Sequence, residues 1–288
     1  MMPDRNALAN RAMTASIAAR TKAGLDLINP ICIYALCKAH KVQVRFNAIN
    51  MEGMYQRGTP SRIHLSARRP LPRRAYNCAH ELGHHVFGHG SSIDELREDA
   101  KENPWEDPKE FLADSFAGFV LMPTLGMRQA FAKRDWEPNS ATPVQIFQIA
   151  SEYGVGYTTL ITHLSQSLNM ISRPRATVLK KQKPAAIRAA ILGSLSAEPL
   201  VLVDNAWSTS VIDVEVGMSV LLPSDTEPDS EAITFVKDLP AGRLFEAGTP
   251  GIVRVIQPDT GWAAFVRIAR KQYIGLAEFR HLEEDADE

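Results

Sequence analysis

The pentapeptide HELGH at residues 80–84 constrains this chain of 288 residues more than any other feature. On an α-helix, residues four apart lie on one face, so the imidazoles of His80 and His84 can reach a single metal ion. Glu81 lies beside that face, where its carboxylate can contact a water on the metal. Two imidazole ligands with a neighbouring carboxylate base are typical of zincins, which use them for metal-assisted hydrolysis. The alternative is an ordinary helix that carries two surface histidines.

The residues around the motif favour a helix from Pro72 to Phe87. At about 100° per residue, small and apolar side chains gather on one side of this helix, and His80 and His84 lie on the other. The apolar side consists of Ala75, Cys78, Ala79, Leu82 and Val86. Pro72 suits the first turn and Gly88 suits the end. We therefore expect a short buried helix with the candidate ligands on one face.

A catalytic zinc site takes three protein ligands and leaves one position open for water. The metzincin pattern is excluded as the source of the third ligand, because Phe87 and Gly90 occupy its positions. Glu110 and Asp114 are four apart and share a face of an expected helix. Glu110 would bind the metal, and Asp114 would accept the free ring N–H of a ligating histidine and so fix its tautomer. The alternatives are His89 as third ligand, and a solvated helix face that carries both acids.

These residues belong to two longer blocks. The first is AHELGH at residues 79–84, and the second combines Glu110-(x)3-Asp114 with Phe116-Ala117 and Leu121-Met122-Pro123. Together the blocks resemble the ImmA/IrrE metallo-endopeptidases of bacteria and their mobile elements, over roughly residues 30–170. The resemblance implies that His80, His84 and Glu110 hold zinc, or manganese, and that Glu81 is the catalytic base.

The resemblance also implies what the protein acts on. Characterised members of this family cleave helix-turn-helix repressors and so release transcription of stress or mobile-element genes. We therefore expect a zinc-dependent endopeptidase whose partner is a helix-turn-helix repressor. Two departures from the family pattern bear on substrate choice: the run Ala75–Ala79 replaces Arg-x-x-Phe-Thr-x-Ala, and the loop Ser91–Pro108 is long and acidic.

Composition and charge fit a soluble protein of the cytoplasm. Hydrophobic residues make up 45% and charged residues 23% of the chain, and the net charge is −1, which gives no global attraction to nucleic acid or membrane. No apolar run approaches the length of a membrane span, and the N-terminus lacks the apolar core of a signal peptide. Cys32, Cys37 and Cys78 are an odd count that argues against a disulfide framework. Cys78 is expected as a buried thiol.

The segments before the motif are expected to form helices and a small sheet. Helices are expected at 4–24 and 29–40, and strands at 42–46, 51–56 and 63–66. The strands would form the small antiparallel sheet of a zincin, whose outer strand can pair with an extended substrate. His64 in the third strand would contact substrate or be a half-exposed structural histidine. Tyr76, His64 and His163 are equivalent candidates for stabilising the oxyanion.

The segment 144–170 resembles a helix-turn-helix, with Gly154-Val155 at the turn. The second helix, 157–168, contains no Lys or Arg, whereas DNA binding depends on cationic contacts to phosphate. We therefore expect a structural hairpin and no direct specific DNA binding. The alternative function is a DNA-binding transcriptional regulator with a structural or vestigial metal site, against which the intact Glu81 argues. A metal-dependent hydrolase for a non-peptide substrate is a third hypothesis.

The expected fold class is α+β, in three segments. Residues 1–172 form a mainly helical zincin-like domain with the small sheet and the hairpin, and residues 173–198 form a basic linker or helix. Residues 199–288 form a β-rich domain of unknown role, because short strand patterns recur there. Those patterns lie at 200–203, 211–216, 219–222, 232–236, 252–256 and 262–268.

Overall fold

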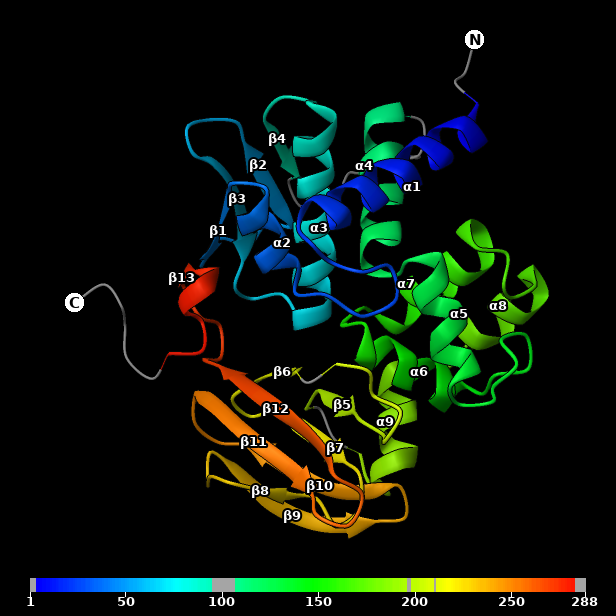
Figure 1. The fold of residues 1–288 in the computed structure, drawn as a ribbon, viewed down its shortest axis with the longest axis vertical. Coiled ribbons are helices and arrows are strands. Elements are labelled where there is room, and N and C mark those ends of the chain that lie inside the picture. Colours follow the sequence, from blue (N-terminus) through cyan, green and yellow to red (C-terminus); the bar gives the residue numbers. More distant parts are fainter. Residues whose placement is uncertain (1–3, 95–106, 196–197, 210, 283–288) are drawn as a thin grey trace. The chain divides into compact units, whose positions relative to one another are not determined.

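The computed structural model describes residues 4–94, 107–195, 198–209 and 211–282. They form a mixture of helices and sheets, which confirms the α+β class at that level (Figure 1). The chain packs as two compact units. The first contains the described residues of 1–129 and 272–278, and the second those of 130–271 and 279–288. The boundaries at 172 and 198 that the sequence suggests lie within the second unit, and as a division into functional domains they stay a prediction.

Four helices build most of the first unit. They are α1 (Arg5–Lys22), α2 (Ile33–Ala39), α3 (Leu71–Phe87) and α4 (Pro108–Leu121). The helix α3 ends at Gly88, whose φ of 67° lies in the left-handed region that glycine tolerates. The side chain of Asp107 caps α4 by accepting a hydrogen bond from the Lys109 amide. The helix α4 packs between α1 and α3, so the HELGH helix is enclosed (Figure 1).

A five-stranded sheet completes the first unit. Its strands are β1 (Val42–Asn47), β2 (Gly53–Gln56), β3 (Ser61–Ser66), β4 (Ser92–Asp94) and β13 (Gly275–Leu276), in the order β13-β1-β3-β2-β4. The expected all-antiparallel sheet is wrong in one pairing, because β1 and β3 run parallel. After β1 the chain leaves room for one strand before it forms β2. A hairpin then turns it back, so that β3 lies between β1 and β2. His64 therefore lies in an interior strand, and β13 and β4 are the end strands of the described sheet.

One face of this sheet is buried against α2 and α3. Phe46, Ile63 and Leu65 are at most 1% exposed and lie on that face. Cys78 of α3 is fully buried, which confirms the expectation of a buried thiol, and its Sγ lies 3.6 Å from Sγ of Cys37. The core of the first unit is thus the layer between the sheet and α3.

The helical part of the second unit follows α5 (Thr124–Ala132), which connects the two units along the chain. It contains α6 (Pro143–Glu152), α7 (Tyr157–Thr162), the π-helix η2 (His163–Ser167), α8 (Arg173–Lys180) and α9 (Pro184–Leu192). A capping box of Thr142 and Gln145 starts α6. Gly154, with φ of 61°, turns the chain between α6 and α7. The segment 144–170 is thus a pair of helices with a short turn, and the basic segment that follows is helical.

Two four-stranded sheets form the rest of the second unit, as the sequence predicted in outline. One has the order β5 (Leu200–Leu202), β7 (Ser219–Leu222), β10 (Gly242–Ala247) and β9 (Ile233–Leu239). The other has the order β6 (Val211–Glu215), β12 (Trp262–Ala269), β11 (Gly251–Gln257) and β8 (Glu227–Pro228). No helix in the described part of the chain combines the length and the apolar character that crossing a membrane requires.

Candidate metal centre

The helices α3 and α4 bring three candidate ligands to one point. The ligand atoms of His80, His84 and Glu110 all lie within 4.8 Å of one another. Nε2 of His80 lies 3.0 Å from Nε2 of His84, and Oε2 of Glu110 lies 3.2 Å and 3.7 Å from these two nitrogens. Two imidazole nitrogens and one carboxylate oxygen are a donor set that suits a divalent ion such as zinc.

The close approach of the two helices depends on small residues. A Cβ added at Gly83 would lie 3.0 Å from Cα of Ala113 and 3.2 Å from its carbonyl oxygen. Ala113 and Ala117 are fully buried on the facing side of α4. Because no side chain separates the backbones here, Glu110 at the start of α4 reaches the histidines of α3.

The carboxylate of Glu110 carries its negative charge into the site. Hydrogen bonds to His80 and His84 hold the pKa of Glu110 well below its usual range, although partial burial opposes this shift. The group is therefore an anion at neutral pH. An ionised carboxylate is the form that a metal ion binds.

The second nitrogen of each imidazole has its own partner. Nδ1 of His80 lies 3.0 Å from Oδ1 of Asp114. A carboxylate accepts only, so this contact places the ring hydrogen on Nδ1 and leaves the Nε2 lone pair for the site. Nδ1 of His84 lies 3.0 Å from Nδ1 of His89. If His89 accepts a hydrogen bond from Nδ1 of His84, the ring hydrogen of His84 also lies on Nδ1. This requires a neutral His89 ring.

The environment of His89 favours that neutral ring. Burial, followed by the nearby His84, lowers the pKa of His89 to about 4. His89 therefore contacts Nδ1 of His84, the ring nitrogen that does not belong to the candidate site. The third residue whose ligand atom lies beside those of His80 and His84 is Glu110, and not His89. The sequence did not suggest this contact, because His89 follows the glycine that ends the helix.

The candidate base Glu81 is fully buried and faces β2. A Cβ added at Gly53 of β2 would lie 2.7 Å from Oε1 of Glu81. The glycine therefore leaves the room that this carboxylate occupies between α3 and the sheet. Sequence reasoning missed Gly53, although a glycine inside a strand signals a close approach of other groups. Nearby, Tyr55 of β2 anchors α3 through a 2.8 Å hydrogen bond to Nδ1 of His85.

The three candidates for oxyanion stabilisation lie in different surroundings. The hydroxyl of Tyr76 donates to the backbone oxygen of Asp114 at 3.3 Å, and burial raises the pKa of Tyr76 far above its usual range. His64 alternates with the buried Ile63 in β3, so it faces away from α3. Its Nδ1 lies 3.2 Å from Nδ2 of the Asn47 side chain. His163 belongs to the π-helix of the second unit. Tyr76 thus contacts Asp114, which in turn contacts the candidate ligand His80.

A helix with two histidines and a glutamate, closed by a carboxylate from the next helix, is the arrangement of a metallopeptidase site. The comparison with known families agrees. Residues 37–165 match the model of the IrrE N-terminal-like domain, Peptidase_M78. The resemblance to the ImmA/IrrE proteins is thereby confirmed, and a protein is the substrate class that the family indicates. A search of curated proteins finds no match to the chain.

Proposed function

We propose that this protein is a zinc-dependent endopeptidase in which His80, His84 and Glu110 hold the metal. The observation that carries the proposal is the convergence of these three ligand atoms within 4.8 Å, one residue along the helix from a buried glutamate. Manganese is the second candidate ion, because mixed imidazole and carboxylate ligation accepts it as well.

The residues divide the chemistry among them. When bound, the metal supplies a Lewis acid that polarises the scissile carbonyl and acidifies the attacking water. Glu81 takes the proton of that water and delivers it to the leaving amine. Asp114 holds the tautomer of His80, and Tyr76 holds the backbone of Asp114 in place. These two residues act through His80 and not on the substrate.

We further propose a helix-turn-helix repressor as the substrate, which would connect the protein to transcription of stress or mobile-element genes. The support is the family of the catalytic domain. An extended substrate segment would pair with an end strand of the sheet and not with β3, since both sides of β3 are occupied by β1 and β2. The β-rich part of the second unit would recognise the substrate or sense a signal.

The helix pair α6 and α7 is proposed as a structural element without specific DNA binding. Tyr157, Leu160 and Ile161 of α7 are buried, and residues 157–168 contain no Lys or Arg. A helix of this kind has few groups with which to hold phosphates.

The test is metal-dependent cleavage. The purified full chain is incubated with a candidate repressor, with and without a chelator and after zinc is added back, and the products are identified by mass spectrometry. We expect a defined cut that the chelator abolishes and zinc restores. Sequence-specific DNA binding at physiological salt, together with no metal-dependent cleavage of any repressor, would reverse the assignment.

A further inference from the structure

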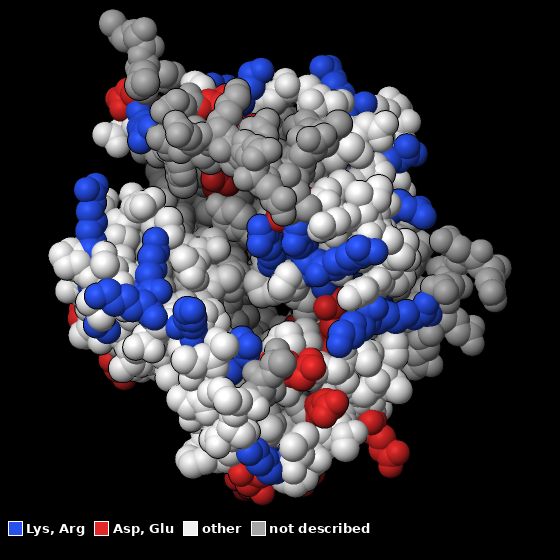
Figure 2. All heavy atoms as spheres, turned by 180° about the vertical axis from the view of Figure 1, so that it is seen from behind, with Lys and Arg blue, Asp and Glu red and all other residues white. Residues whose placement is uncertain are grey.

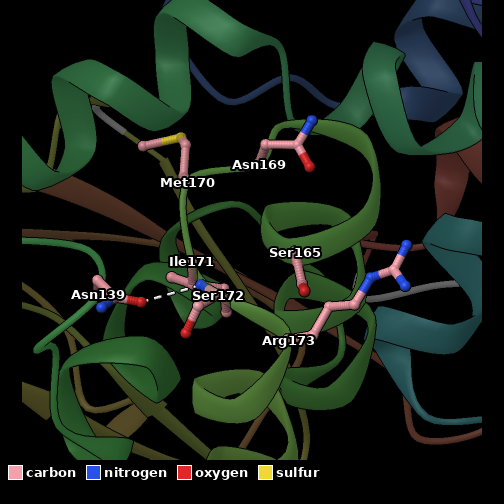
Figure 3. A pocket seen from close by; sticks show the side chains of 7 residues that line it. All are labelled: Asn139, Ser165, Asn169, Met170, Ile171, Ser172 and Arg173. Atoms are coloured by element: carbon pink, nitrogen blue, oxygen red, sulfur yellow. Dashed lines mark hydrogen bonds between the residues drawn. The ribbon is translucent and has the colours of Figure 1, made fainter.

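A polar pocket of about 380 Å³ lies in the second unit, where the π-helix η2 leads into α8. Figure 3 shows the side chains that line it, among them Ser165 of η2 and Ser172 and Arg173 at the start of α8. Asn169, with φ of 52°, turns the chain between the two helices. A volume of this size is in the range of small-molecule sites, which begin at about 300 Å³.

The lining of this pocket offers hydrogen-bond donors and positive charge. It contains Arg173, two serine hydroxyls and the side-chain amides of Asn139 and Asn169, and no carboxylate. Within the described residues, no ion pair neutralises Arg173, whose side chain is exposed. The first turn of α8 adds the positive end of the helix dipole. These features favour a negatively charged ligand.

The hydroxyl of Ser165 is an independent sign of a ligand. Ser165 is 6% exposed, and its side chain lines the pocket. The surrounding helix is a π-helix, in which the Leu168 amide bonds to the His163 carbonyl at 3.0 Å. Such wide turns are frequent at functional sites. The hydroxyl of a buried residue that lines a pocket is a donor available to a bound group.

The start of α8 is held in place by its neighbours. The Ser172 amide donates to the side-chain oxygen of Asn139 at 2.9 Å, the bond drawn in Figure 3. The Ser172 hydroxyl accepts from the Arg175 amide at 3.3 Å as the N-cap. Ser172 and Asn139 on the wall of the pocket are therefore positioned before any ligand arrives, which lowers the cost of binding.

We propose that this pocket binds a phosphate-type oxyanion, either free phosphate or the phosphate group of a small monoester. Arg173 supplies the charge, and Ser165 donates from the buried side. The wider surroundings support an anion, because residues 173–188, which run from α8 into α9, contain six basic residues and no acid. Lys and Arg are also prominent on the face of the molecule seen in Figure 2. The proposal does not depend on the proposed protease activity.

A small molecule fits the pocket better than a nucleic acid backbone. The site is concave, and the neighbouring segment 157–168 has no cation that could follow a strand of phosphates. Binding of duplex DNA in place of a small anion would therefore contradict the proposal.

The experiment is isothermal titration of the full chain with inorganic phosphate and with a phosphate monoester, at constant ionic strength. The protein is titrated both free of metal and zinc-loaded, because phosphate can also bind a zinc ion. We expect one phosphate per chain that does not require metal. Arg173→Gln should weaken it about tenfold or more, since a charge-assisted hydrogen bond is lost. Ser165→Ala should weaken it about fivefold.

Lys181→Gln is the matched control, because it removes a charge from the same basic run outside the pocket lining. It should leave phosphate affinity unchanged, and Arg173 is exposed, so its variant should fold. Absence of phosphate and monoester binding would overturn the proposal, as would binding that both pocket variants retain in full. Binding of duplex DNA that Arg173→Gln weakens, without binding of either small anion, would also overturn it in favour of nucleic acid.

Discussion

Gly53 and Glu81 are in contact across the interface between β2 and α3. A Cβ added at Gly53 would lie 2.7 Å from Oε1 of the Glu81 carboxylate, a separation that real Cβ atoms essentially never show. The two residues are far apart in sequence, and the pairing of β2 with β3 sets their distance. The position of the proposed base thus depends on the absence of a side chain in the sheet.

Gly53→Ala should therefore displace the Glu81 carboxylate without removing it. Because the far end of the Glu81 side chain can turn, we expect an intact fold and zinc affinity close to that of the wild type. Proteolysis should fall about a hundredfold, the scale of a misplacement of about 1 Å. Repressor cleavage and zinc titration measure the two effects separately.

A double-variant cycle makes this prediction specific. Aspartate at position 81 is shorter, so Gly53→Ala should cost much less activity in the Glu81→Asp background than in the wild type. Gly248→Ala is the control, because its added Cβ would lie at an ordinary 3.5 Å from the Ala232 carbonyl. Equal losses in both backgrounds would mean that the glycine serves the fold and not the carboxylate.

Glu81→Gln should separate metal binding from catalysis. Glutamine keeps the size of the side chain but cannot take the proton of the attacking water. We expect unchanged zinc stoichiometry and a loss of cleavage of at least about two orders of magnitude. Cleavage at a rate near that of the wild type, measured by mass spectrometry of the products, would contradict a role as general base.

Glu110→Ala should weaken zinc retention strongly, because it removes the only carboxylate of the converging group. Asp114→Asn should weaken zinc by about ten- to a hundredfold, the usual cost of altering a partner of a ligating histidine. Competition with a chelating dye measures both affinities. Unchanged affinity in Glu110→Ala would show that the third ligand has been misassigned.

The sequence predicted which candidate site residues lie on the same face of one helix. His80 and His84, like Glu110 and Asp114, are four residues apart, and this spacing alone places each pair on one face. The contact between the two pairs also requires the two helices to pack, and the small residues Ala117 and Gly118 indicated a close approach. The position where the backbones meet, at Gly83 and Ala113, comes from the structure. The contact between His84 and His89 lies beyond the helix end, where no periodicity applies.

The strand order could not be predicted in the same way. Alternating side chains indicated β1, β2 and β3, but alternation does not say which strands are neighbours. The parallel pairing of β1 and β3 follows from the hairpin that returns the chain beside β1. The strand β10 was missed because Gly242 opens it and Leu244 and Phe245 are both buried, which breaks the period of two.

His281 should make the stability of the second unit depend on pH. Burial, and then the positive charge of Arg280, lowers the pKa of His281 to about 4 from an ordinary value of 6.5. The unfolded chain therefore binds a proton at this residue between pH 6.5 and pH 4, where the folded state does not. Stability is complete above pH 6.5 and falls as the pH drops through this window.

The measurement is urea unfolding of the wild type and of His281→Gln at pH 7 and pH 5. Glutamine does not titrate, so the wild type should lose about 2 kcal/mol more than the variant between these two pH values. Asp213, which lies 3.5 Å from Nε2 of His281, does not disturb the comparison. Its pKa is lowered below the ordinary value of 3.8, chiefly by Arg267 against the opposing effect of burial, so it stays ionised throughout. Equal losses in the two proteins would show that the His281 ring is accessible to protons in the folded state.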